Sequence, residues 1–322
     1  MSARCDVSAG AALRDLAASV PKSLVPPDQL SELQLLADRL PMTTGAGLEC
    51  PLQPGAATGW CVRFRTDDER ASLAGLDGLN EPWPRIRALG GRWLREAAAW
   101  PVRNVWLEFD SARHSSPSVF FDTGGPARAA SADPWFWLDV AGLLQGQSVR
   151  REVVDRVLAC LDALPSTGFL GYAGVMLGRA DAALRLTFDG LGAADAVPLL
   201  ERFGRRESAL AAAVASVGHL DPRVVLHLDV DAGIGTTLGA EIFARDWRPM
   251  LEPLLAHLGK SEFVEPLLGW TGVSPAISLG PRNHLLRRLN HIKVVEKKDT
   301  PLAAKAYLYY GLWQTGGNGG RS

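Results

Sequence analysis

The residues best suited to chemistry lie near the end of this 322-residue chain, in "HIKVVEKKDTPLAAKAYLYYGLWQ", residues 291 to 314. Side chains of an extended strand alternate between two faces. His291 and Lys293 therefore share one face, and Lys305, Tyr307 and Tyr309 share another in the following segment. Lysines can bind an anion, and aromatic rings can stabilise a cation. What matters is whether these faces point into the protein.

Further strand-like segments have a polar row on one face and an apolar row on the other. The polar rows contain Arg63 and Arg65 in 59–66, Trp106, Glu108 and Asp110 in 102–110, Tyr172 and Met176 in 170–176, Arg185 in 183–189, His227, Asp229 and Asp231 in 224–231, and Glu241 after them. If these rows converge in a confined space, unpaired cations are unfavourable because each buried charge costs several kcal/mol. An anionic ligand is then expected to pair with them.

The elements that must position these rows repeat along the chain. Hairpins are predicted to begin near residues 102, 170, 223 and 291, with a weaker one at 45 to 66, and helices at 82–99 and 149–164 lie between them. This strand-strand-helix repeat predicts an antiparallel sheet of about ten strands. Two α+β arrangements remain: an open sheet with one solvated face, or a closed barrel with helices outside and a polar lumen. Aromatic residues in the polar rows favour the barrel.

Composition limits the function. The net charge of -1 gives no support for nucleic-acid binding, and no run of apolar residues is long enough for a membrane span, so a cytoplasmic protein is expected. The widely spaced Cys5, Cys50, Cys61 and Cys160 are predicted to be reduced thiols. Residues 1–314 are predicted to form one barrel domain, and the Gly-rich residues 315–322 a disordered tail.

Together these features resemble the aromatic prenyltransferases of the ABBA type, the PT-barrel enzymes, including members that modify indoles or peptides. The features shared are five hairpins separated by helices and successive strands carrying Arg, Lys and Tyr on the polar row. The Lys-x-Tyr of "AKAYLYY", Lys305 and Tyr307, is similar to a recurring element of the indole branch.

The resemblance implies a soluble enzyme that joins an allylic isoprenoid diphosphate, the donor, to an aromatic (indole or phenol) or peptide acceptor. It implies that the donor diphosphate is bound by Arg63, Arg65, Arg185, Lys293 and Lys305. It also implies that the allylic cation is shielded by Trp106, Tyr172, Met176, Tyr307 and Tyr309. Glu108 is expected to orient and deprotonate the acceptor, with Asp110 and His227 as further catalytic candidates.

Two other functions stay open. Asp229 and Asp231 could hold Mg²⁺ through oxygen ligands, and with Glu241 and His227 they could support metal-dependent phosphoryl transfer or hydrolysis. His227 could instead form an acid/base relay with Asp229, which shares its face. A non-catalytic binding protein of a biosynthetic pathway is the second alternative.

Overall fold

The computed structural model describes residues 8–314 except 77–79, 97–101, 112–115, 124–133, 179–182, 204–207, 231–233, 281–282 and 298–299. Asp231, Cys5 and the predicted tail at 315–322 therefore lie outside the described residues.

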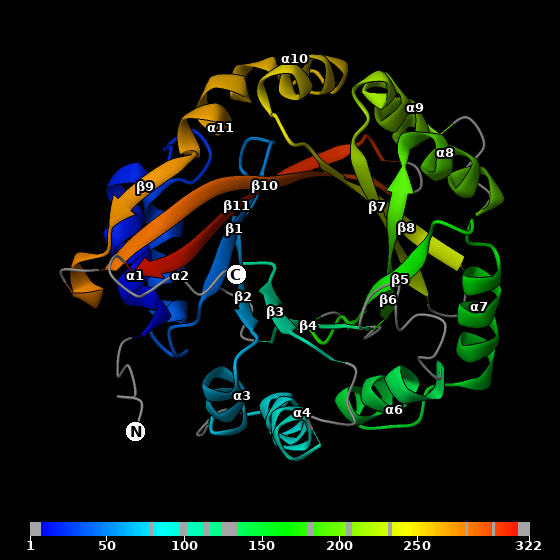
Figure 1. Cartoon of the computed structure of the whole chain (residues 1–322), viewed down its shortest axis with the longest axis horizontal. Coiled ribbons are helices and arrows are strands. Elements are labelled where there is room, and N and C mark those ends of the chain that lie inside the picture. Colours follow the sequence, from blue (N-terminus) through cyan, green and yellow to red (C-terminus); the bar gives the residue numbers. More distant parts are fainter. Residues whose placement is uncertain are drawn as a thin grey trace.

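The strands of the described chain form one antiparallel sheet that closes on itself (Figure 1). The ring order is β11-β1-β2-β3-β4-β5-β6-β7-β8-β10, and β10 also pairs with β11. The predicted closed barrel is confirmed, and the open sheet is wrong. The strands are β1 (Gly45–Pro51), β2 (Gly59–Phe64), β3 (Val105–Phe109), β4 (Ser118–Asp122), β5 (Phe169–Val175), β6 (Leu184–Gly192), β7 (Arg223–Val230), β8 (Ile234–Phe243), β9 (Gly272–Pro275), β10 (Asn283–Lys297) and β11 (Ala303–Gln314).

The last hairpin differs most from its prediction. β10 begins at Asn283 and not near residue 291, and the short strand β9, which was not predicted, pairs with its first half. The consecutive residues Arg287 and Arg288 interrupt the apolar alternation that would have marked this extension in the sequence. The long β10 carries three neighbours, because it pairs with β8, β9 and β11.

Helices surround the barrel (Figure 1). The apolar strand rows face them: Val105, Leu107 and Phe109 of β3 are completely buried and belong to the hydrophobic core. The helices of the described residues are α1 (Ala9–Leu16), α2 (Pro27–Ala37), α3 (Asp67–Ala74), α4 (Trp83–Arg95), α6 (Pro134–Gln145), α7 (Arg151–Asp162), α8 (Ala193–Arg202), α9 (Ala209–Ser216), α10 (Arg248–His257) and α11 (Val264–Trp270), with 3-10 turns η1 (Ala17–Ser19), η2 (Gly218–Leu220), η3 (Ser261–Phe263) and η4 (Ile277–Leu279).

One helix start also fixes the end of the first hairpin. Thr66 caps α3, and Glu69 completes a capping box by accepting from the Thr66 backbone N–H. The Glu69 carboxylate also accepts from the backbone N–H groups of Arg65 and Thr44, at 2.6 Å and 2.5 Å. This single carboxylate therefore joins α3 to the residues that follow β2 and precede β1.

The cysteines and the helices bear on two further predictions. Cys50, Cys61 and Cys160 are buried free thiols, as predicted. Among the described helices, none has the length and apolar character required to cross a bilayer.

Candidate active site

Strand alternation positions the side chains of the lumen. While Val105, Leu107 and Phe109 face the helices, Trp106 and Glu108 line the interior cavity. The same alternation brings Tyr172 of β5, His227 of β7 and Tyr307 of β11 to the lumen. The polar rows of the sequence thus converge inside the barrel.

The larger cavity, here called the outer chamber, has a volume of about 210 Å³ and an aromatic wall. That is room for several water molecules, so it is an open cavity and not a packing defect. Its lining residues are Gly47, Cys61, Trp106, Glu108, Phe120, Tyr172, Thr187, Asp189, Arg223, Val225, His227, Glu241, Phe243, Asn290, His291, Tyr307 and Tyr309.

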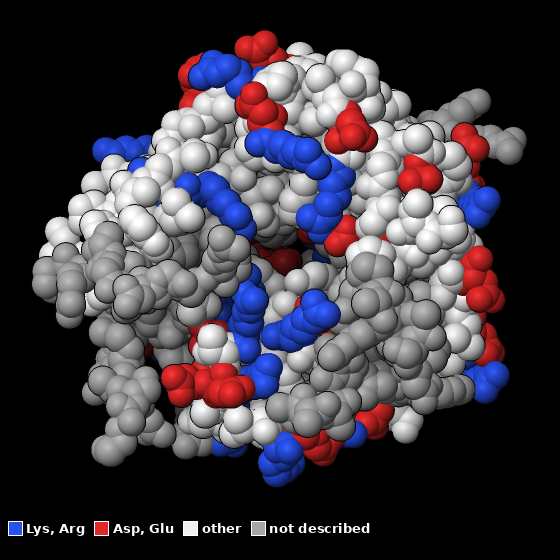
Figure 2. All heavy atoms as spheres, viewed as in Figure 1, with Lys and Arg blue, Asp and Glu red and all other residues white. Residues whose placement is uncertain are grey.

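Arg223 lines the outer chamber, and Arg63 and Arg288 contact its lining residue Tyr309. These three residues are called the mouth arginines. Arg63 donates to the Tyr309 hydroxyl at 3.3 Å and lies 5.6 Å from the Trp106 ring centre, while Arg288 lies 4.8 Å from the Tyr309 ring centre. Figure 2 shows Lys and Arg side chains around a central hollow. Among the described residues, no carboxylate pairs with Arg63 or Arg288, and the buried Arg63 Nε has no hydrogen-bond partner.

Arg223 differs from the other two mouth arginines. It donates two hydrogen bonds to Asp189, at 2.8 Å and 2.6 Å, and stacks 4.3 Å from the Phe243 ring centre. Its charge is therefore partly balanced. The surplus positive charge at this end of the barrel lies on Arg63 and Arg288.

A second cavity of about 130 Å³, the inner chamber, is lined by four cations and few aromatic groups. Glu108 and His227 line both chambers and mark their junction. The lining residues are Glu108, Arg185, His227, Thr237, Gly239, Lys293, Val295, Lys297, Ala303 and Lys305.

Most inner-chamber cations already have acidic partners on neighbouring strands. Arg185 makes a two-pronged ion pair with Asp229, at 2.6 Å and 2.9 Å. Lys305 and the Tyr307 hydroxyl both donate to Glu49, and Lys293 lies 3.8 Å from Glu241. Lys293 and Lys305 are directly opposite each other in the sheet, a repulsive arrangement that these carboxylates offset. An anionic ligand is therefore not required to neutralise them.

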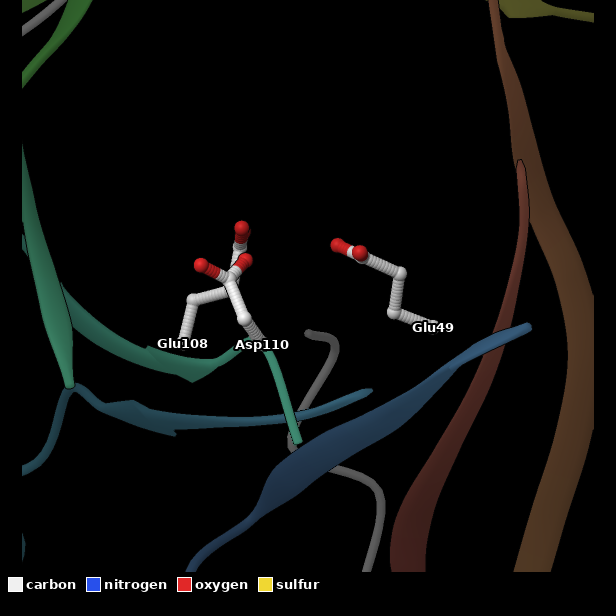
Figure 3. A group of neighbouring side chains, drawn as sticks. All are labelled: Glu49, Glu108 and Asp110. Carbon is white, nitrogen blue, oxygen red and sulfur yellow. The ribbon is translucent and has the colours of Figure 1, made fainter. Parts of the chain in front are cut away.

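Three carboxylates meet beside the junction, as Figure 3 shows: Glu49 extends from β1 toward Glu108 of β3 and Asp110, which follows β3. One ligand oxygen from each lies within 4.8 Å of the others. Burial would raise the pKa of Glu49, but the charges of Lys305 and Lys293 outweigh it and hold that pKa at about 2. Burial and the Glu49 charge raise the pKa of Glu108 to about 7. Two adjacent carboxyl groups are thus tuned to different protonation states.

A second polar cluster lies on the opposite wall, around Glu241. One of its oxygens lies 2.7 Å from His227 Nε2 and 3.3 Å from His291 Nε2. Burial lowers the pKa of His227 to about 4, and Lys293 and Arg185 act in the same direction against the opposing charge of Glu241. His227 is therefore neutral at physiological pH. The predicted partner Asp229 is paired with Arg185 instead.

The remaining predicted site residues do not all lie in the chambers. Arg65 is exposed beyond the end of β2, and Met176 is completely buried and lines neither chamber. Asp110 belongs to the carboxylate cluster. Of the proposed Mg²⁺ ligands, Asp229 gives both oxygens to Arg185, so a metal would have to displace that pair, and Asp231 is outside the described residues. Magnesium binding stays a prediction.

Sequence reasoning missed Glu49 and Asn290. Glu49 is 1% exposed although it is charged, and a lone acid within "GAGLECP" was the available signal. Asn290 enters the outer chamber beside His291 because a register shift between Leu289 and His291 interrupts the alternation. No period-two pattern could place both neighbours in the lumen.

Comparisons with solved structures give the fold a known counterpart. The crystal structure of 5-dimethylallyltryptophan synthase from Streptomyces coelicolor matches with a TM-score of 0.51 and 16% identity, over 96% of this chain and 98% of that one. The chain has the PT-barrel fold of the ABBA prenyltransferases.

Other PT barrels match over similar lengths. The same synthase in complex with DMASPP and Trp matches with a TM-score of 0.50 and 15% identity, over 96% of this chain and 95% of that one. PriB in complex with product diphosphate matches with a TM-score of 0.48 and 15% identity, over 95% of this chain and 96% of that one. No protein-family description and no curated protein sequence matches the chain. The likeness is one of fold.

Proposed function

We propose that this PT barrel is a prenyltransferase that joins an allylic diphosphate to an aromatic acceptor, an indole or phenol or such a group in a peptide. The observation that supports it most is the combination of groups around the outer chamber. Two arginines without a carboxylate partner among the described residues contact its aromatic rings, and Glu108 lies where it meets the inner chamber. This combination matches the three needs of the reaction.

The first need is positive charge at the leaving group. Ionising an allylic diphosphate develops negative charge on its bridging oxygen, and fixed cations away from bulk water stabilise that charge strongly. Arg63 and Arg288 contact the aromatic rings of the outer chamber and have no carboxylate partner among the described residues, whereas Lys293 and Lys305 each lie near one. Arg63 is half-buried and Arg288 is exposed, so Arg63 is the better shielded of the two. We therefore assign the diphosphate to the mouth arginines.

The second need is a surface that stabilises the allylic cation without reacting with it. Aromatic faces do so electrostatically, and Trp106, Tyr172 and Tyr309 line the outer chamber next to the mouth arginines. The third need is a base for the acceptor. Glu108 lies at the junction of the chambers with a pKa raised to about 7 by burial, so it can hold or release a proton near neutral pH.

Titration calorimetry with dimethylallyl, geranyl and farnesyl thiodiphosphates, with and without Mg²⁺, tests donor binding. We expect at least one analogue to bind, and failure of all three under both conditions would exclude the function. Glu108→Gln should leave donor affinity unchanged and lower turnover of an indole or naphthol acceptor by about 10²- to 10⁴-fold. Glu265→Gln, at an exposed site on α11, is the matched control. Binding without any turnover would favour the alternative of a non-catalytic binding protein.

A further inference from the structure

His227 occupies a position that the proposed reaction has not yet used. Apart from Glu108 it is the one described residue that lines both chambers, so it faces the place where donor carbon and acceptor ring must meet. His227 is 7% exposed, and neither its Nδ1 nor its Nε2 makes a well-aligned hydrogen bond among the described residues, although Nε2 lies 2.7 Å from a Glu241 oxygen. A buried polar atom without a partner is unfavourable, because it has lost its hydrogen bonds to water. A bound substrate could relieve that cost.

The neighbouring groups determine which nitrogen of His227 carries the hydrogen. Asn290 Nδ2 lies 3.1 Å from His291 Nδ1, and because an amide nitrogen only donates, the His291 hydrogen is on Nε2, facing Glu241. The ionised Glu241 carboxylate can only accept, and its oxygen lies 2.7 Å from His227 Nε2 in a contact too poorly aligned to count as a hydrogen bond. An unprotonated Nε2 would place its lone pair against that oxygen, so the short distance favours the hydrogen on Nε2. Nδ1 of His227 is left with a free lone pair.

Prenylation at a ring carbon creates a need for such a lone pair. When the ring attacks the allylic carbon, the C–O electron pair leaves with the diphosphate, and the new C–C bond leaves the ring as an arenium cation. The ring regains aromaticity only when the C–H bond at the attacked carbon breaks and its electron pair returns to the ring. The proton must go to a nearby base.

The carboxylates are less suited to this step. Glu49 is occupied by Lys305 and Tyr307. Glu108 accepts a hydrogen bond from the acceptor N–H or O–H, whose proton stays with the product, so that one proton in total, the ring proton, is released. Resting on the proposed function, we propose that His227 Nδ1 accepts the ring proton after prenyl transfer, and that Glu241 and His291 are positioning residues that fix its tautomer.

The charges around His227 fit this role. Glu241 of β8 stabilises the imidazolium that forms, whereas Lys293 of β10 and Arg185 of β6 oppose it, and Glu108 faces it from β3. Burial keeps the pKa of His227 at about 4, so the base is free at neutral pH. An arenium cation is a far stronger acid than the His227 imidazolium, so proton transfer from the ring to Nδ1 is still favourable. The weak base then releases the proton readily for the next cycle.

The tautomer is tested without any substrate. Nitrogen-15 NMR of the histidine-labelled protein at pH 7 reports the tautomer, and His227→Asn assigns the signal. We expect His227 to be neutral and protonated on Nε2. Protonation on Nδ1, or an imidazolium, would overturn the inference. Glu241→Gln offers an amide N–H in place of a carboxylate oxygen and should shift the hydrogen of His227 toward Nδ1. This result is independent of whether the protein transfers a prenyl group.

Proton removal is tested with dimethylallyl diphosphate and indole that carries deuterium at every ring carbon. We expect His227→Asn to lower kcat by about 10²- to 10⁴-fold, with unchanged binding of dimethylallyl thiodiphosphate and a primary isotope effect on kcat that exceeds that of the wild type. His219→Asn, an exposed histidine on η2, should behave as the wild type. Unchanged kcat, or slow turnover without a larger isotope effect, contradicts the role. If circular dichroism shows His227→Asn to be unfolded, the wild-type tautomer and Glu241→Gln decide.

Discussion

The outer and inner chambers both contain basic side chains, but they balance charge differently. In the inner chamber, Arg185 and Lys305 each contact a carboxylate on an adjacent strand, and Lys293 lies near another. At the outer chamber, Arg63 and Arg288 lie against aromatic rings. A row of lumen cations is thus not by itself a phosphate site. The cations available to a ligand are those that the protein has not already neutralised.

The largest expected effect is a loss of folding stability when an ion pair of the inner chamber is broken. Asp229→Asn leaves the buried Arg185 guanidinium without its counter-charge, and breaking a buried pair in this way costs about 3–5 kcal/mol. Urea unfolding should show this loss. Asp155→Asn breaks the exposed Arg151–Asp155 pair on α7 and should cost only about 0–1 kcal/mol. Equal losses for the two variants would mean that the inner pair is not stabilising.

An intermediate effect is expected for donor affinity, and it distinguishes the two chambers. Arg288→Met should weaken binding of dimethylallyl thiodiphosphate by roughly 10- to 100-fold, because a charge-assisted contact is lost. Lys305→Met combined with Glu49→Gln removes a neutralised pair and should change affinity by less than about threefold. Calorimetry measures both. The reverse order would restore the sequence-based assignment of the diphosphate to Lys305.

The smallest effect is a pH dependence of stability that belongs to the junction. The pKa of Glu108 is raised from 4.5 to about 7 by burial, so the folded state holds this proton more tightly than the unfolded state. Ionisation therefore destabilises the folded protein as pH rises from about 4.5 through about 7. Glu108→Gln should match the wild-type melting temperature near pH 4.5 and exceed it at pH 8 by a few °C. Parallel melting curves across this range would contradict the raised pKa. Lys305 and Lys293 hold the pKa of Glu49 at about 2 against the effect of burial, so its ionisation stabilises the folded protein above about pH 4.5, and this contribution is lost only as the pH falls from about 4.5 toward 2.

Much of the barrel could be predicted because its signals are local. Alternation along 105–109 sends Trp106 and Glu108 to one face and Val105, Leu107 and Phe109 to the other, and hairpins separated by helices repeat this pattern. Since the apolar rows had to be covered by the helices, the lumen-facing face of the regular strands followed from the sequence, whereas Glu49 and Asn290 were missed. The start of β10 and the strand β9 did not, because Arg287 and Arg288 interrupt the pattern there.

The sequence by itself determined the two faces of each regular strand, since strand periodicity is a property of each segment alone. The register shift that brings both Asn290 and His291 into the lumen was not part of that pattern. Only the tertiary structure decided which of them meet. Lys305 and Glu49 are 256 residues apart, and Arg185 and Asp229 are 44 apart. These partners are set by the register between strands and by the pairing of β11 with β1 that closes the ring. Because charge balance depends on those partners, only the closed barrel shows that, among the described residues, Arg63 and Arg288 have no carboxylate partner and that His227 Nδ1 has no hydrogen-bond partner.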